Sequence, residues 1–333
     1  MSKQENCKPC EKFKTMIGGQ ALIEGIMMRG PEKDAIVCRG KDGLSVQVTE
    51  RKVPAEGSPL RWPLIRGVYN FFDSQVTGVK ALLHSADLSP EEYEEEPSKL
   101  DRWLEEKLGD ERFQKLVIGT AAFMGMGLSI LLFFLLPMII GGFFDGVVKT
   151  TLGINLIEGL VRMVIFMTYM IAISRMKDMK RLFAYHGAEH KTIRCYEARM
   201  ELTVENVRIQ TRLHPRCGTS FLLVVMILSI LVFSIASSAL LSLVPALAVM
   251  RGSFVYRLVM IVFKLMLLPL VVSIAYEINR WVGKNDNALT RLLTGPGLWM
   301  QNFTTNEPDD DMIEVAILAV KQVLPEQEGS DEW

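Results

Sequence analysis

The sequence predicts a mainly α-helical, polytopic membrane protein with about four transmembrane helices and a small cytosolic α+β portion that contains a β-hairpin. Apolar residues gather in long runs after residue 115, whereas the first third of the chain is polar and charged. The runs approach or exceed the ~20 residues that a helix needs to cross a bilayer. The formal net charge of −1 leaves no charge excess that would attract nucleic acid, so no nucleic-acid partner is expected.

Residues 1–15 are polar and are predicted to be a disordered tail. The tail contains Cys7 and Cys10, a lone CxxC pair that can bind a metal or change redox state but is more often incidental without a second pair. The chain has five cysteines. This odd count, with no regular framework, argues against a disulfide-stapled scaffold.

Residues 16–86 are predicted to form a cytosolic α+β segment. Four glycines between Gly18 and Pro31 indicate tight backbone geometry. Alternating apolar residues at 35–39 and 44–49 flank an Asp-Gly turn, which predicts a hairpin and allows a larger sheet. Apolar residues at helical spacing predict an amphipathic helix over Leu64–Leu83. That helix suits either the membrane interface or the hairpin as its packing surface.

Residues 87–115 are predicted to be an acidic linker and a charged helix that leads into the membrane. Residues 116–174 contain the first two spans, Leu116–Ile140 and about Ile154–Ser174. Residues 219–276 contain the third span and a fourth at about Phe254–Tyr276. In the second span Glu158 and Arg162 stand four residues apart and can pair on one face of the helix.

The distribution of lysine and arginine predicts the orientation. The loop 175–218 contains ten of these residues, whereas the connections 141–155 and 244–253 have one each. The positive-inside rule therefore predicts a multi-pass cell-membrane protein with the 175–218 loop and both termini in the cytoplasm. The C-terminal segment 277–333 is expected to be irregular over Gly283–Glu307 and to end in a helix over Pro308–Leu324, with Pro308 and three aspartates at its start.

The 175–218 loop contains the strongest chemical pattern in the chain. His186-Gly-Ala-Glu189-His190 fits H-x-x-E-H, and on a helix two histidines four residues apart face one side and can share a metal. In zinc hydrolases with this order the glutamate is the general base. The motif is short, and two surface histidines on a charged helix are about as frequent an outcome.

Further candidate ligands stand near predicted helix ends. His214 and Cys217 lie at the start of the third span, and Glu277 lies at the end of the fourth. Imidazole and thiolate are ligands that zinc accepts, so a divalent metal, with zinc as the expected ion, is the predicted cofactor. Glu197 is a spare carboxylate on the face of His186. Lys264 lies about mid-membrane, where an ionisable side chain indicates a function or a buried partner.

Several longer motifs extend over nearly the whole chain. They are Gly18–Gly25 with Met27–Pro31, Pro63–Gly67, Tyr185–Thr192, His214–Ser220, Gly295–Trp299 and Thr304–Asp310. In these motifs the chain resembles the YqhQ-like family of bacterial multi-pass membrane proteins, a domain of unknown function that is commonly described as a predicted metal-dependent enzyme. The resemblance implies a metal site, and the site residues that it implies are His186, Glu189, His190, His214 and Cys217. It also draws attention to Gln20, Glu24, Arg29 and Arg66 as polar motif positions without an assigned role.

Three functions fit these observations. The first is a membrane-embedded zinc-dependent hydrolase that acts on a lipid or peptide, with Glu189 as catalytic base and an open metal position. The second is a scaffold or binding protein whose closed site holds a structural metal. The third is a transporter that uses Lys264, which four spans without an evident inverted repeat make the weakest of the three. Membrane lipids and a membrane-protein partner or second copy of the chain are the expected partners.

Overall fold

The computed structural model describes residues 13–88, 107, 109–144, 146–148, 150–327 and 329–332. It divides into two compact units. The sheet unit comprises the described parts of residues 1–90, 170–225 and 269–333, and the helical unit those of 91–169 and 226–268. Cys7, Cys10 and most of the predicted tail and acidic linker lie outside the described residues. Within the predicted tail Thr15 is ordered, because it forms a β-bridge with Glu332.

The sheet unit contains a four-stranded antiparallel sheet, β1(Gly18–Leu22), β2(Gly25–Arg29), β3(Lys33–Gly40) and β4(Gly43–Glu50), in the order β1-β2-β3-β4. The predicted hairpin is β3–β4. The glycine-rich stretch, for which the sequence predicts tight backbone geometry, forms a second hairpin, β1–β2. Its two-residue turn places Glu24 at a φ of 50°, a left-handed conformation that non-glycine residues adopt rarely.

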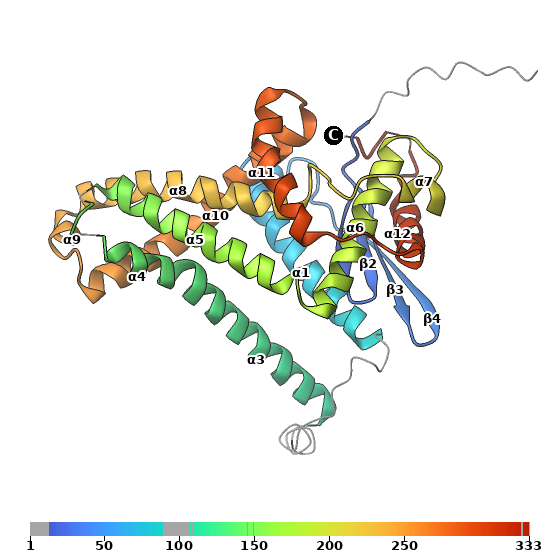
Figure 1. Cartoon of the computed structure of the whole chain (residues 1–333), viewed down its shortest axis with the longest axis horizontal. Helices are drawn as coiled ribbons and strands as arrows, with labels where there is room; N and C mark the ends of the chain where they lie inside the picture. Colours follow the sequence, from blue (N-terminus) through green and yellow to red (C-terminus); the bar gives the residue numbers. More distant parts are fainter. Residues whose placement is uncertain are drawn as a thin grey trace, which may run out of the picture. The chain divides into compact units, whose positions relative to one another are not determined.

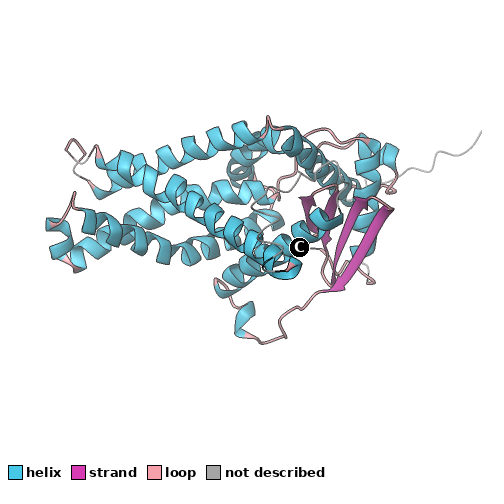
Figure 2. Cartoon of the chain, turned by 90° about the horizontal axis from the view of Figure 1, so that it is seen from below, coloured by secondary structure: helices cyan, strands magenta, loops and turns pink. Residues whose placement is uncertain are grey.

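Helices cover both faces of this sheet (Figures 1 and 2). Ile26 and Met28 of β2 pack in one core with α6(Lys177–Glu197) and α12(Asp310–Val323), whereas Met27 packs in a second core with Ala81 of α1(Ile65–Leu88). The alternation follows from the period of two along a strand. The amphipathic helix therefore contacts the sheet, one of the two surfaces expected for it.

The prediction of an irregular segment over Gly283–Glu307 is wrong. α11(Ala288–Thr304) occupies most of it, after a capping box in which the Asn287 and Thr290 side chains each accept from the other's backbone N–H. Such a box stabilises the first turn of a helix. Gly295 and Pro296 lie inside the helix, and Gly297 lies so close to Ser220 that a methyl group there would overlap its hydroxyl oxygen. Short elements η1(Pro59–Arg61) and α7(Val204–Arg208) complete the unit.

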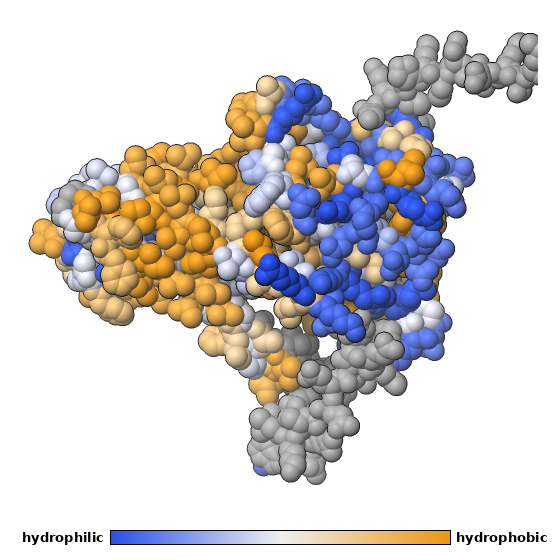
Figure 3. All heavy atoms as spheres, viewed as in Figure 1, coloured by the Kyte–Doolittle hydropathy of each residue, from blue (hydrophilic) through white to orange (hydrophobic). Residues whose placement is uncertain are grey.

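Four helical segments are long and apolar enough to cross a membrane, with mean hydropathies of 1.9 to 2.6: Gly119–Gly142, Thr151–Ile173, Gly218–Leu243 and Phe254–Lys284. The first is built from α3(Asp110–Ile130), the π-helical turn η3(Leu131–Leu135) and α4(Leu136–Gly142); the others are α5, α8 and α10, with α9(Pro245–Val249) between the last two. Hydrophobic residues cover the visible surface of these helices, and hydrophilic residues dominate that of the sheet unit (Figure 3).

The interior of the helical unit contains charged side chains. Glu158 and Lys264 form an ion pair and are both buried. Glu158 does not form the ion pair with Arg162 that the spacing allowed. The Arg162 Nε instead donates to the Phe133 carbonyl at 2.7 Å and its Nη1 to Ser229 at 3.0 Å.

Candidate metal centre

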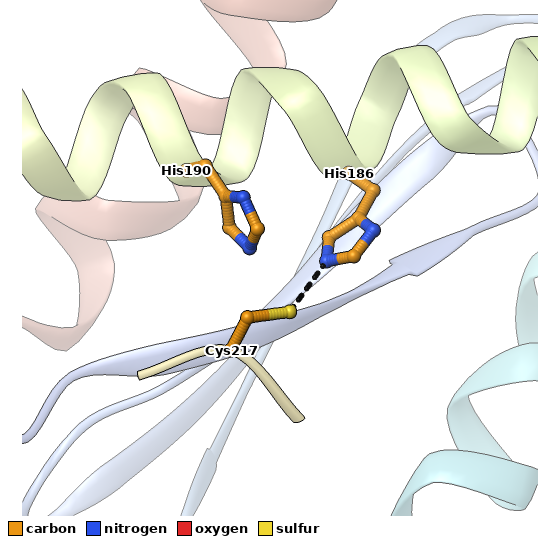
Figure 4. A group of neighbouring side chains, drawn as sticks. All are labelled: His186, His190 and Cys217. Atoms are coloured by element: carbon orange, nitrogen blue, oxygen red, sulfur yellow. Dashed lines mark hydrogen bonds between the residues drawn. The ribbon is translucent and has the colours of Figure 1, made fainter. Parts of the chain in front are cut away.

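Two elements of the sheet unit bring three side chains together (Figure 4). His186 and His190 project from one face of α6, with ring centroids 4.3 Å apart. Cys217 immediately precedes α8. One ligand atom of each residue lies within 4.8 Å of those of the other two. His190 and Cys217 are buried and His186 is half-buried, so the three groups meet inside the protein and not on its surface.

Backbone carbonyls fix how both imidazoles present their nitrogens. His186 Nδ1 lies 2.7 Å from the Thr304 carbonyl oxygen, and His190 Nδ1 lies 2.6 Å from that of Arg212. A carbonyl oxygen only accepts, so each Nδ1 carries the hydrogen and donates. In the neutral rings both Nε2 lone pairs then remain for the site. Orientation of a metal-binding histidine by such a bond from its other nitrogen is the usual arrangement in metalloproteins.

Charges within the group favour an ionised thiol. Burial alone would raise the pKa of Cys217, but the His186 and His190 rings outweigh it and bring this pKa well below its usual range. Burial alone would likewise lower the pKa of His186, but the neighbouring Cys217 thiolate raises it to about 9. The Nε2–Sγ distance is 3.2 Å. Without a metal ion, both shifts favour an imidazolium–thiolate pair, and a divalent cation can replace the proton that the pair holds.

Glu189 lies beside this group and is also buried. Its Oε1 accepts from the Gly19 N–H at 2.9 Å, and its Oε2 has no hydrogen-bond partner among the described residues. Burial raises the pKa of Glu189, and the His186 and His190 rings oppose that shift. A buried carboxylate oxygen without a partner is costly. This cost indicates that a ligand, a water molecule or a metal-bound group normally satisfies it.

Two glycines allow the backbone to approach the site, and their role was missed from sequence. A Cβ on Gly19 would lie 2.7 Å from the Met27 oxygen and 3.0 Å from Glu189 Cδ, and one on Gly187 would overlap the Asn306 carbonyl oxygen. The positions of these glycines within the Gly18–Gly25 and Tyr185–Thr192 motifs could have indicated this role, since glycine allows close approach of the backbone. The carbonyls of Thr304 and Arg212 were also missed, because any residue type can supply a carbonyl.

His214, predicted as a ligand, lies outside the group of three. Its ring contacts that of His190 at a centroid distance of 5.6 Å, but its Nε2 faces Glu197 Oε2 at 3.4 Å. Burial, with help from Arg194, lowers the pKa of His214 to about 4, so the ring is neutral and can donate to that carboxylate. Glu197, the spare carboxylate of the prediction, also pairs with Arg216. Both residues therefore act in a polar network next to the site.

Glu277, another predicted ligand, lies elsewhere in the unit. Both of its oxygens are engaged by the Arg66 guanidinium, with Nε 2.7 Å from Oε1, which accounts for one of the unassigned motif positions. The Arg66–Glu277 pair joins α1 to α10. Lys264, in the helical unit, is paired with Glu158 as described above.

The other unassigned motif positions brace the sheet. Glu24 is buried, pairs with Arg181 of α6 and accepts from the Tyr185 hydroxyl at 3.2 Å. Arg29 bonds to both oxygens of Asp34 at 3.0 Å and to Asp73 at 2.9 Å. Gln20 faces α1, where its side-chain amide lies against Gly78. These contacts connect β1 and β2 to α1 and α6, and none of the four side chains belongs to the group around Cys217.

The donor set fits a borderline-soft divalent cation. Two imidazole nitrogens and a thiolate are ligands that Zn²⁺ accepts, and His190 Nε2 is buried with no partner among the described residues. Two convergent acceptor nitrogens beside a thiolate repel one another unless a proton or a cation lies between them. Three protein ligands leave one position of a tetrahedral zinc site open.

Comparison with known proteins places the chain in a family. A sequence model of the family described as "Protein of unknown function (DUF1385)" matches residues 62–326. The chain belongs to the DUF1385 family. A protein of Bacillus subtilis (strain 168), described as "Uncharacterized protein YqhQ", is 32% identical over 325 residues, which cover 92% of each of the two chains. No solved structure matches the chain significantly. The family resemblance seen in the motifs is therefore confirmed.

Proposed function

We propose that His186, His190 and Cys217 bind one divalent metal ion, with zinc the best match, and that this DUF1385 protein is a metal-dependent hydrolase. One observation carries the proposal: the two Nε2 lone pairs converge on the Cys217 sulfur while the Glu189 Oε2 beside them has no partner among the described residues. The Nδ1 bonds to carbonyls turn both Nε2 atoms towards the Cys217 sulfur, as bonds from the other ring nitrogen do for metal-binding histidines. Three ligands with a carboxylate alongside are typical of a catalytic site, not of a closed structural one.

Glu189 is the proposed general base. The Gly19 N–H holds its Oε1 at 2.9 Å, so Oε2 is the oxygen that accepts the proton of the attacking water. A bound zinc ion would supply Lewis acidity and make that water more acidic. The raised pKa of Glu189, caused by burial, brings the carboxylate nearer to the range in which it can take a proton and then return it to the leaving group. A lipid or a peptide at the membrane surface is the proposed substrate class, which the four helices that are long and apolar enough to cross a membrane support.

Metal analysis of the purified protein tests the first part of this proposal. We expect about one equivalent of zinc, the stoichiometry of a single site, and its loss in His186→Ala, His190→Ala and Cys217→Ser. His84→Ala on α1 is the matched histidine control and should keep the metal. Absence of metal in the protein as purified and after addition of zinc would rule out the site, as would equal metal contents in the site variants and the control.

A non-catalytic scaffold with a structural metal is the second candidate, and burial favours it. His190 is 1% exposed and Cys217 is 7% exposed, and together with Thr304 the group ties α6 to the start of α8 and the end of α11. Glu189→Gln separates the two candidates. A hydrolase should keep its metal but lose hydrolysis of ester, amide or phosphodiester substrates, whereas a scaffold should keep both its metal and its cellular phenotype. Glu205→Gln, at an exposed position of α7, is the matched control.

We further propose that the metal site and both termini face the cytoplasm. The loop 175–218 contains Lys177, Lys180, Arg181 and seven more basic residues, and the opposite connections contain one each, which supports this orientation through the positive-inside rule. A C-terminal fusion to green fluorescent protein should fluoresce in bacterial cells, and a C-terminal alkaline phosphatase fusion should be inactive. The reverse pattern would place the site outside.

A further inference from the structure

The helical unit contains a second polar site, far in sequence from the histidines. A cavity of about 40 Å³ lies where α4 ends and where α5 and α10 begin. At the ~10–15 Å³ that one water requires, it has room for a few water-sized groups. The surrounding helices are apolar, but several side chains that line the cavity are polar or charged. They include Thr151, Asn155, Glu158, Ser237, Arg257 and Lys264.

Two long helices direct their N-termini at this cavity. Thr151 and Asn155 belong to the first turns of α5, and Tyr256 and Arg257 to the first turn of α10. The free N–H groups and the dipole of a helix N-terminus favour a negative charge. Two converging N-termini at the end of an apolar helical unit therefore create a positive potential before any side chain is counted.

The charged side chains add to this potential. Arg251, Arg257 and Lys264 line the cavity, and Glu158, which is already paired with Lys264, is the single carboxylate among the described lining residues. Arg251 donates to Thr151 Oγ1 at 2.8 Å. Asp145 and Lys149 of the α4–α5 connection lie outside the described residues and carry opposite charges. Arg257 therefore remains as a lining cation whose charge no described lining carboxylate offsets, and a positive charge among apolar helices favours an anion.

A buried hydroxyl supplies an independent sign of a missing ligand. Ser237 of α8 is 0% exposed and lines the cavity, and its Oγ has no hydrogen-bond partner among the described residues. Most serines inside helices bond back to a carbonyl in the preceding turn, as Ser234 does to the Ile230 oxygen at 2.6 Å. Ser237 instead keeps a donor for a group that occupies the cavity.

We propose that this cavity binds the phosphate group of an anionic phospholipid. A phosphate diester offers acceptor oxygens and a negative charge, which match the guanidinium of Arg257, the Ser237 hydroxyl and the two helix N-termini. The lipid is the source favoured over free phosphate because exposed apolar side chains adjoin the cavity: Leu152 is 58% exposed, Val255 52% and Leu258 51%. These residues offer a surface along which acyl chains can lie while the headgroup enters the cavity.

Thermal unfolding of the delipidated full-length protein in detergent tests this proposal. The ligands are dioleoylphosphatidylglycerol, dioleoylglycerol, which lacks the phosphate, and inorganic phosphate. Phosphatidylglycerol should raise the Tm saturably, as a ligand that binds the native state does. Arg257→Gln should weaken its apparent affinity about tenfold or more, the effect of one charge-assisted hydrogen bond. Arg175→Gln, just beyond the other end of α5, is the matched control and should bind as the wild type does.

Ser237→Ala keeps the test decisive should Arg257→Gln fold poorly. Without lipid, this variant should have an equal or higher Tm, because an unpartnered buried hydroxyl is destabilising. With phosphatidylglycerol it should show an affinity about fivefold weaker than the wild type, the loss expected for one neutral hydrogen bond. Equal Tm rises from dioleoylglycerol and phosphatidylglycerol, or unchanged affinity in both variants, would overturn the proposal. A Tm rise from inorganic phosphate alone would overturn the lipid assignment.

Discussion

Substitution of Gly187 by alanine tests how the proposed metal centre is held in place. The added methyl group would overlap the Asn306 carbonyl oxygen and lie 3.2 Å from its carbon. Since apolar carbon atoms rest ~3.5–4.0 Å from their neighbours, the backbone around residue 306 must move by about 1 Å. Thr304 lies two residues earlier and is not part of this contact, but its carbonyl oxygen accepts a hydrogen bond from His186 Nδ1 at 2.7 Å. A displacement of this size would break that hydrogen bond.

The magnitudes separate binding from stability. Loss of an orienting bond to a ligand histidine typically costs 10–100-fold in metal affinity, or about 1.4–2.8 kcal/mol. Overpacking should cost about 1–3 kcal/mol of unfolding free energy, but alanine regains about 1 kcal/mol of helix propensity over glycine. The net destabilisation is therefore about 0–2 kcal/mol, and the variant should fold.

Zinc affinity measured by competition with a chromogenic chelator, together with thermal unfolding, provides the assay. Gly125→Ala on α3 is the matched control, because a methyl group there meets nothing within 4 Å. We expect unchanged zinc affinity in the control and a tenfold or greater loss in Gly187→Ala. Wild-type affinity in Gly187→Ala would refute the reasoning, since it would mean that the segment holding His186 does not depend on this close contact.

Three further results are expected. In chelator-treated protein the raised pKa of His186 contributes folding stability that is present below pH ~6.5, the unfolded-state pKa, and is lost as the pH rises through about 9. Zinc affinity should instead increase with pH, because protons compete with zinc for His186 and Cys217. Chemical denaturation at several pH values, with and without zinc, measures both trends. Burial, aided by the Glu24 charge, raises the pKa of Cys38 to about 11, so iodoacetamide at pH 8 should leave Cys38 unmodified by mass spectrometry, and rapid labelling would contradict its burial. Lys264→Met leaves Glu158 as a buried unpaired charge and should destabilise the protein by about 3–5 kcal/mol, with much of the loss recovered when Glu158→Gln is added; a transport role for Lys264 requires a phenotype that the double variant does not recover.

Sequence patterns predicted those features that depend on local spacing. The four apolar runs, the β3–β4 hairpin and the i, i+4 placement of His186 and His190 on a helix follow from periodicity and from turn chemistry. Cys217 was correctly placed at the start of a span. The α11 helix was missed because Gly295 and Pro296 resemble a loop, although the capping residues Asn287 and Thr290 were visible.

The destination of individual polar side chains was harder to predict. Glu277 and His214 lie near ends of long apolar helices, as a ligand at one membrane face would. Each side chain, however, has another partner that the sequence spacing does not reveal. Glu277 pairs with Arg66, 211 positions away, and His214 faces Glu197. Glu158 likewise forms its ion pair with Lys264 of α10, whereas Arg162, four residues from it, donates to the Phe133 carbonyl. Such choices depend on three-dimensional proximity, which local sequence patterns do not encode.

The use of main-chain carbonyls to orient both histidines has a consequence for how this protein tolerates mutation. Side-chain substitution at position 304 leaves the carbonyl oxygen in place, so an alanine scan would pass over a position that orients His186. Position 212 differs, because the Arg212 guanidinium also donates to the Gln301 and Thr305 carbonyl oxygens and so holds the segment that contains Thr304. Changes of the side chain at position 304 need not disturb the proposed metal centre, provided that the path of the backbone is kept. The orientation of the ligands is thus encoded in chain geometry, and insertions, deletions or crowding near residues 304–306 should damage it more than any exchange of side chains there.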